Sequence, residues 1–243
     1  MSARRTWATA ARVLRQIRHD HRTVAMLVVV PVLIMTIMHW ILPAHDFATF
    51  GPPLLGIFPL LIMFLITSVT TLRERSGGTL ERLLSMPVAK ADIVGGYALA
   101  FGVLGALQAV VVAGFSFWVL GLAAAGPGWQ LGLLAVVQAL LGTALGLFVS
   151  AFAATEFQAV QFMPAVLIPQ LLLCGLIVPV AALPTVARWI ADVLPLTYAM
   201  NAVREVMRFD HPTAAFWSNL AIVGLFVVAL LVAGAATLRR RTA

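Results

Sequence analysis

Six apolar runs, each about as long as a lipid bilayer is thick, limit what this chain can fold into. They cover residues 24–42, 51–72, 93–122, 129–153, 159–178 and 217–238. A helix needs about 20 predominantly apolar residues to cross the hydrocarbon core, and a segment there must satisfy its backbone polar groups internally. The sequence therefore predicts an all-α integral membrane protein with six transmembrane helices.

The composition argues against a soluble domain beside the six spans. The chain has 243 residues, of which 62% are hydrophobic and 10% are charged, whereas roughly 25% of the residues of a soluble domain are charged. A soluble enzyme is excluded, because so few polar groups cannot cover a globule in water. The segments between the runs are too short for a large extramembrane domain. Residues 1–243 are therefore expected to form one transmembrane domain.

The basic residues indicate the orientation. Of the 16 Lys and Arg residues, 13 lie in the segments 1–22, 73–92 and 239–241. These segments fall on one side of a six-span topology, and Lys and Arg concentrate on the cytoplasmic side of membrane proteins. We therefore expect both termini to be cytoplasmic and the chain to contact membrane lipid. Fifteen of the 16 basic residues are arginine, a bias typical of a GC-rich bacterial genome, so a bacterial cytoplasmic membrane is expected. Topology accounts for the net charge of +7, so no nucleic acid partner is expected.

Residues 1–22 have the pattern of an amphipathic helix rather than of a span. At 100° per residue, apolar side chains such as Trp7, Val13 and Ile17 fall on one arc, and most of the six arginines fall on the opposite one. Such a helix is expected to lie in the headgroup plane with its arginines towards anionic lipid. A disordered basic leader is the alternative.

The segment 73–92 has the signals of a short helix between two breaks. Gly77 and Gly78 interrupt the incoming helix, Thr79 can cap a new one, and Pro87 ends it. Its apolar face consists of Leu80, Leu83 and Leu84, opposite Glu81 and Arg82. An apolar face flanked by charges is what a groove on a partner protein receives. A plain connecting loop is the alternative.

Residues 179–216 are too polar to span a membrane, yet they are rich in proline and apolar residues. Helical pieces are expected at about 185–194 and 196–208. Together they fit a re-entrant or interfacial cap, in which non-helical backbone must be buried in protein. Three acids balance the three arginines of this segment, so we expect no strong field that would steer charged ligands.

Several of these segments together resemble the ABC-2 type transporter permeases, the short six-span class that includes drug and antibiotic exporters. The stretch from Glu74 to Pro87, which reads E-R-S-G-G-T-L-E-R-L-L-S-M-P, is similar to their cytoplasmic coupling segment. Residues 1–22 resemble their interfacial elbow helix. The stretch from 175 to 204, with L-P-L-T-Y at 194–198, resembles their fifth-span exit and external cap.

The resemblance also implies roles for individual residues. ATPase-coupling contacts are expected at Glu74, Gly78, Thr79, Leu80, Glu81, Leu83, Leu84 and Pro87, and the external cap is expected to use Pro195, Thr197, Tyr198 and Arg204. One departure is Tyr97 after Gly96, where such permeases often carry a basic residue. Only a local effect on interface anchoring is expected from it.

The resemblance further implies a complex of two permeases, identical or paired with a sister chain, and two ABC ATPase subunits that grip residues 79–85. The phosphate-binding loop G-x-x-x-x-G-K-S/T does not occur in the sequence. We therefore expect ATP and Mg²⁺ on the ATPase subunit and no cofactor in this chain. The resemblance implies export, and an apolar path favours a lipophilic or amphipathic cargo such as a drug, an antibiotic or a lipid.

Polar residues within the spans are candidates for the substrate pathway. We favour Thr67, Ser68, Gln161 and Gln170, because the resemblance implies that the second and fifth spans line the central path. Hydrogen bonding between helices is the alternative for each, since a polar group in lipid needs a partner. Gly142 and Gly146 form a G-x-x-x-G face suited to close helix packing.

No catalytic or metal site is expected. His39, His45 and Asp46 are close in sequence but form a weak set of metal ligands, and no nucleophile motif is present. Two alternative functions remain. A cofactor-assembly permease of the haem-export type is left open by His39, Trp40 and His45. An intramembrane enzyme would need paired catalytic residues, and the spans contain no acid and no second histidine beside His39.

Overall fold

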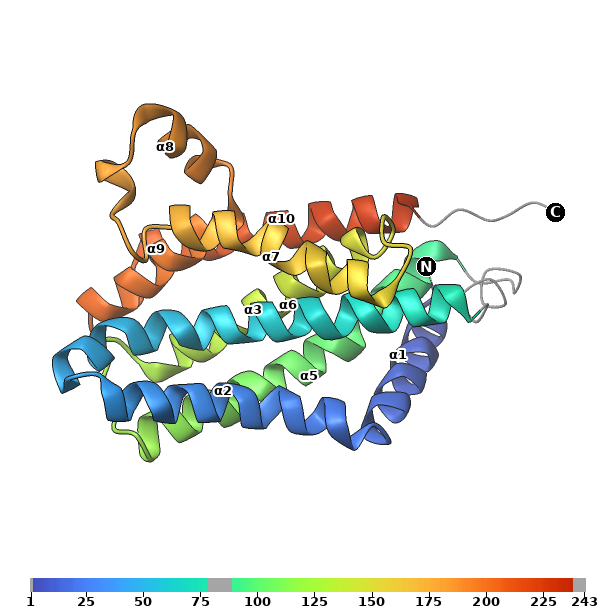
Figure 1. Ribbon diagram of the computed structural model, residues 1–243, viewed down its shortest axis with the longest axis horizontal. Coiled ribbons are helices and arrows are strands. Elements are labelled where there is room, and N and C mark those ends of the chain that lie inside the picture. The colour runs from blue at the N-terminus through green and yellow to red at the C-terminus, as the bar shows by residue number, and fades with distance from the viewer. Residues whose placement is uncertain (1, 78–88, 238–243) are drawn as a thin grey trace.

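The computed structural model describes residues 2–77 and 89–237, which form an all-helical bundle (Figure 1). The helices are α1 (Ala3–Arg18), α2 (His21–Ile41), α3 (Ala44–Ser76), α5 (Lys90–Trp118), α6 (Gly128–Val149), α7 (Glu156–Leu173), α8 (Thr185–Asp192), α9 (Pro195–Arg208) and α10 (Ala214–Thr237), with a 3₁₀ turn, η1 (Val180–Ala182), before α8. Six of these described helices, α2, α3, α5, α6, α7 and α10, are long and apolar enough to cross a membrane. The predicted all-α architecture with six spans is confirmed.

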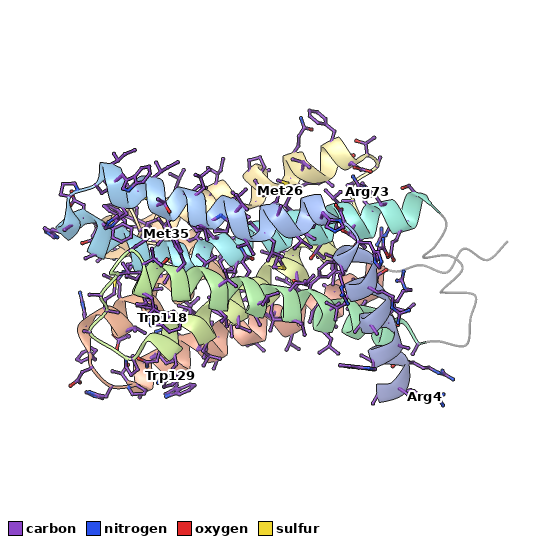
Figure 2. The ribbon with its side chains drawn as sticks, turned by 90° about the horizontal axis from the view of Figure 1, so that it is seen from below. Arg4, Met26, Met35, Arg73, Trp118 and Trp129 are labelled. Carbon is purple, nitrogen blue, oxygen red and sulfur yellow. The ribbon has the colours of Figure 1, made fainter. Side chains whose placement is uncertain are left out.

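The long helices run side by side, so the bundle has two ends. The short helix α1 lies across one of them, where α3 finishes and α5 begins (Figure 1). We call this the α1 end, and we call the opposite end, which carries α8 and α9, the cap end. Figure 2 shows Arg4 and Arg73 at the α1 end and Trp118 and Trp129 towards the cap end. Both tryptophans are exposed, as expected for aromatic side chains at a membrane interface.

Helices α3 and α6 form the centre of the bundle and make its most extensive helix–helix contact. Gly142 and Gly146 of α6 face the backbone of α3. A Cβ atom at Gly142 would lie 2.2 Å from the carbonyl oxygen of Leu60, and one at Gly146 would lie 2.7 Å from that of Phe64. The missing side chains let the two backbones approach closely, as small residues do in membrane helix pairs. The G-x-x-x-G face therefore packs as the sequence predicted.

The other spanning helices leave most of their surface outside the bundle. In the most apolar windows of α3 and α6, 61% and 67% of the residues are buried, against 17% in α2, in α7 and in α10. Exposed apolar side chains such as Val29, Ile168 and Leu225 lie on these outer helices. Such a surface needs lipid or another protein to cover it, because apolar area in water is costly.

Several helices begin or end away from the boundaries expected from hydropathy. Helix α3 continues through Arg73 to Ser76, and its 33 residues make it about 50 Å long, more than the hydrocarbon thickness of about 30 Å. Helix α5 ends at Trp118 rather than at residue 122, because Gly121 has φ +65° and a right-handed helix cannot continue through it. Helix α7 ends at Leu173 rather than at residue 178, just before Gly175 with φ +84°.

Candidate functional site

A buried polar cluster at the α1 end joins three helices. Arg12 of α1 donates two hydrogen bonds to the carboxylate of Glu74 in α3, at 3.0 Å to Oε1 and 3.1 Å to Oε2. The hydroxyl of Tyr97 in α5 donates to Oε2 of Glu74 and accepts from Nη2 of Arg12 at 3.3 Å. Glu74 is 5% exposed and Tyr97 is 1% exposed. The paired charges compensate each other, so the carboxylate can remain buried at this position.

The same end of the bundle is closely packed around α1. Ala10, Val13 and Ile17 are buried against α5 and α2, and a Cβ atom at Gly96 would lie 2.5 Å from Cβ of Thr9. The buried face of α1 matches part of the apolar arc predicted from the sequence. Tyr97 does more than the expected anchoring at an interface, because its hydroxyl completes the ion-paired cluster beside Gly96.

The cluster lies immediately before the predicted coupling segment. Glu74 points into the bundle towards Arg12 rather than away from it, so its charge holds α3 to α1 in this structure. The other predicted coupling residues lie outside the described part of the chain; they are Gly78, Thr79, Leu80, Glu81, Leu83, Leu84 and Pro87. Their contact with an ATPase therefore stays a prediction.

None of the four predicted pathway residues lines either of the two pockets described below. Thr67 and Ser68 are buried where α3 packs against Gly146 of α6, and the Ser68 hydroxyl donates to the carbonyl of Leu65 at 3.1 Å. Gln170 is buried and donates to the carbonyl of Val166 within its own helix, and Gln161 is exposed on α7. Thr67 and Ser68 therefore lie in a contact between α3 and α6, but the Ser68 and Gln170 bonds run within one helix rather than between helices. A role of the four residues in a pathway stays a prediction.

A lateral groove lies instead on the neighbouring face of α3. It has a volume of about 580 Å³ and is bounded by α2, α3 and the start of α7. Its wall on α3 consists of Ile62, Leu65, Ile66, Val69, Thr70 and Arg73. This spacing of three and four residues marks one helical stripe, and the stripe is distinct from the buried one that contains Thr67. The groove was not found from the sequence, although the spacing of these residues was available there.

The groove is apolar along its length and charged at the α1 end. Arg73 and Glu156 form a two-pronged ion pair across its rim, with both N–O distances at 2.8 Å, and Asp20 at the start of α2 also lines it. Phe157 and Val160 of α7 face it with exposed apolar surface. The arrangement fits a molecule with an apolar body and a polar end.

The cap end holds the last set of predicted residues. Pro195 is the first residue of α9, where its missing N–H costs nothing. The hydroxyl of Tyr198 donates to the carbonyl of Asp192 at 2.6 Å and ties α9 to α8. Thr197 is 3% exposed, and its hydroxyl has no hydrogen-bond partner among the described residues. Arg204 donates to Oδ1 of Asn201 at 2.7 Å and to the carbonyl of Cys174 at 3.1 Å.

Over residues 2–77 and 89–237, no three His, Cys, Asp or Glu side chains gather in a way that could hold a metal ion. The ring of His39 packs edge-on against that of Phe47 with the ring centroids 5.0 Å apart. This aromatic contact joins the end of α2 to the start of α3.

Comparison with known proteins agrees with this architecture. The family described as "ABC-2 type transporter" matches residues 4–207. The "Probable multidrug ABC transporter permease YbhR" of Escherichia coli (strain K12) is 24% identical over 187 residues, which are 76% of this chain and 51% of that protein. The "Linearmycin resistance permease protein LnrN" of Bacillus subtilis (strain 168) is 26% identical over 170 residues, 70% of this chain and 44% of that protein.

A relative from a eukaryote matches a shorter stretch. The "ABC transporter G family member 20" of Dictyostelium discoideum is 32% identical over 142 residues, which are 58% of this chain and 20% of that protein. The chain thus spans about half, or less, of the length of these curated relatives.

Proposed function

Since the chain belongs to the ABC-2 type transporter family, we propose that it is the permease subunit of an ATP-driven exporter that moves a lipophilic or amphipathic compound across a bacterial cytoplasmic membrane. The family match over residues 4–207, together with six helices able to span a membrane, carries the proposal. Drug, antibiotic and lipid cargoes all fit this description.

Charge supports placing the α1 end in the cytoplasm. Helix α1, which lies at this end, carries Arg4, Arg5, Arg12 and Arg15, and Figure 2 shows Arg73 at the same end. Positive residues near span ends favour the cytoplasmic side, so both termini are cytoplasmic and the cap end faces outwards. On this side an ATPase subunit, which holds the ATP and Mg²⁺, reaches the predicted coupling segment.

The cluster of Arg12, Glu74 and Tyr97 supports a route for the ATPase movement. The coupling segment connects Gly77, at the end of α3, to Ala89, just before α5. A push on it therefore acts on two spanning helices at once. The buried ion pair transmits the same push to α1, because Glu74 cannot separate from Arg12 without exposing or orphaning a charge.

The lateral groove supports an amphipathic cargo. Its apolar stripe on α3 is open at the side of the bundle, and its charged rim at Arg73, Glu156 and Asp20 lies at the proposed cytoplasmic end. A cargo in the inner leaflet would lie with its apolar body along Ile66 and Val69 and its polar end at this rim. The exposed apolar surfaces of α2 and α7 beside the groove are available to a second permease copy or a sister chain.

Reconstitution tests the function. The chain is co-purified with an ABC ATPase subunit and inserted into lipid vesicles, and vanadate-sensitive ATP hydrolysis and ATP-dependent movement of a fluorescent amphipathic dye are measured. Leu84→Ala and Glu81→Ala are expected to lose assembly or to uncouple hydrolysis from transport while the chain remains folded. Normal assembly and transport in both variants would contradict the coupling assignment.

A matched pair of substitutions tests the groove. Ile66→Trp fills it, whereas Val110→Trp adds the same bulk to an exposed position on α5. Transport should fall at least severalfold in the first variant and stay near normal in the second, with ATP hydrolysis retained in both. Equal transport by both variants would show that the cargo does not use the groove.

A further inference from the structure

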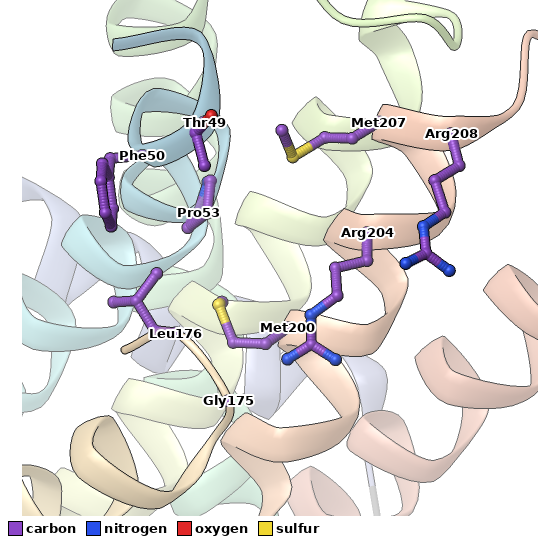
Figure 3. A pocket seen from close by; sticks show the side chains of 9 residues that line it. All are labelled: Thr49, Phe50, Pro53, Gly175, Leu176, Met200, Arg204, Met207 and Arg208. Carbon is purple, nitrogen blue, oxygen red and sulfur yellow. The ribbon is translucent and has the colours of Figure 1, made fainter. Parts of the chain in front are cut away.

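A second pocket, at the cap end, contains two neighbouring arginines (Figure 3). It has a volume of about 360 Å³ and lies between the start of α3, the turn that follows α7, and one face of α9. Arg204 and Arg208 are four residues apart on α9, so they share a helical face, and Figure 3 shows both guanidinium groups on the same side of the helix. Both positive charges therefore lie in the wall of the same pocket.

Neither of these two arginines forms an ion pair within the described part of the chain. Among residues 2–77 and 89–237, neither guanidinium lies within 4 Å of a carboxylate. The acid beside them on α9, Glu205, accepts a hydrogen bond from the Thr213 hydroxyl at 2.6 Å, and Asp210 pairs with His211. The three acids and three arginines counted in the sequence therefore do not form ion pairs at this pocket.

The guanidinium of Arg204 is held in place by close contacts that also remove part of it from water. Gly175 has φ +84°, and a Cβ atom there would lie 2.2 Å from Nη2 of Arg204, so only glycine lets the guanidinium approach this turn. Arg204 bonds to two neutral oxygens, one from Asn201 and one from Cys174. A guanidinium has five N–H donors, so donors remain for a ligand. Desolvation, and to a lesser degree repulsion by Arg208, lower the pKa of Arg204 below its ordinary value.

The rest of the pocket wall is apolar apart from Thr49, whose hydroxyl donates to the carbonyl of His45. Phe50 and Pro53 line it from α3, Leu176 from the turn after α7, and Met200 and Met207 from α9. Methionine side chains adapt to ligands of different shape. The volume is at the small end of the range of about 300–1,000 Å³ for ligand pockets, enough for one headgroup and the adjoining part of a chain.

We propose that this pocket binds the anionic headgroup, a carboxylate or a phosphate, of an amphipathic molecule. The headgroup accepts hydrogen bonds from Arg204 and Arg208, a geometry for which guanidinium groups are well suited. The adjoining carbon atoms pack against Met200, Met207 and Phe50. The molecule is either an anionic membrane lipid or a free amphiphile. Binding needs no ATPase, so this proposal can fail or succeed independently of the proposed function.

Native mass spectrometry of the purified full chain tests the site. The protein is mixed with equal amounts of phosphatidylglycerol and phosphatidylcholine, or titrated with decyl phosphate, with decyltrimethylammonium as the cationic control. Anionic probes should be retained preferentially, and Arg208→Gln should weaken their binding about tenfold or more, the effect of losing one charged hydrogen bond. Arg208 is exposed, so its substitution leaves the fold intact, whereas Arg204→Gln tests the more buried partner.

Arg188→Gln is the matched control. Arg188 lies at the same end on α8 and is exposed, but it donates to the carbonyls of Ala181 and Leu183 outside the pocket. Its substitution should leave binding unchanged. Preference for phosphatidylglycerol assigns a bilayer lipid, and retention of decyl phosphate alone assigns a free amphiphile. The proposal would be overturned if Arg188→Gln and Arg208→Gln weakened binding of the anionic probes equally, or if the cationic probe bound as well as the anionic ones.

Discussion

Replacing Arg12 with methionine should loosen α1 from the bundle. Methionine keeps an apolar stem but removes the guanidinium, so the carboxylate of Glu74, which is 5% exposed, loses its hydrogen bonds at 3.0 and 3.1 Å. Removing one partner of a fully buried ion pair costs about 3–5 kcal/mol. Because Arg12 is 33% exposed and Tyr97 still donates to Glu74, we expect the substitution to destabilise the packing of α1 on the bundle by about 2–3 kcal/mol.

Hydrogen exchange followed by mass spectrometry measures this loss, because α1 can open without unfolding the whole chain. A loss of about 2–3 kcal/mol corresponds to exchange of the α1 amides that is roughly 30- to 140-fold faster. Arg73→Gln is the control. It breaks the pair with Glu156, whose partners are 60% and 50% exposed, and exposed pairs are worth about 0.2–1 kcal/mol.

The double variant Arg12→Met/Glu74→Gln separates the ion pair from simple packing. A neutral amide at position 74 removes the orphaned charge, so most of the protection of α1 should return. The reasoning is refuted if Arg12→Met exchanges no faster than Arg73→Gln, or if the double variant exchanges as fast as the single one.

Two glycine substitutions test the close approaches seen in the structure. Gly142→Ala should destabilise the chain by about 1–3 kcal/mol through overpacking, since its Cβ would meet the carbonyl of Leu60. Gly132→Ala is the control and should be neutral or slightly stabilising, because a Cβ atom there would have no atom within 4 Å. Denaturation in mixed micelles compares the stabilities of the two variants. Gly175→Ala should lower thermal stability and displace Arg204, because it adds a clash to an unfavourable positive φ. Equal stability of the Gly142 and Gly132 variants, or an unchanged melting temperature for Gly175→Ala, would contradict these assignments.

Local signals in the sequence predicted the helices well. Hydropathy identified all six spanning helices, since each must be apolar over its own length to lie in lipid. The proline- and apolar-rich segment 179–216 was also predicted to contain helices at 185–194 and 196–208, and helices are observed at Thr185–Asp192 and Pro195–Arg208. Helix ends were less accurate where one glycine at positive φ, such as Gly121, stops a helix that hydropathy would extend.

Pairings between distant residues could not be predicted in the same way. Arg12 and Glu74 are 62 residues apart in the chain. The sequence predicted that the arginine would face anionic lipid and that the glutamate would contact an ATPase. Thr67 and Ser68 were favoured as polar residues of the second span, which the resemblance places along the central path, and they lie on the face of α3 that packs against Gly146. The groove follows the next face of the same helix. To choose between the two faces of α3, one must know which neighbouring helix packs on each face.

The sequence by itself determined that this chain is a six-span, all-α membrane protein with a basic amphipathic helix at its beginning, because hydropathy and helical periodicity are properties of single segments. Only the tertiary structure decided which charges are neutralised. Glu74 meets Arg12 inside the bundle, whereas Arg204 and Arg208 share a pocket without an acid. The physical reason is that electrostatic energy depends on distance and on burial, and both are set by how the helices pack.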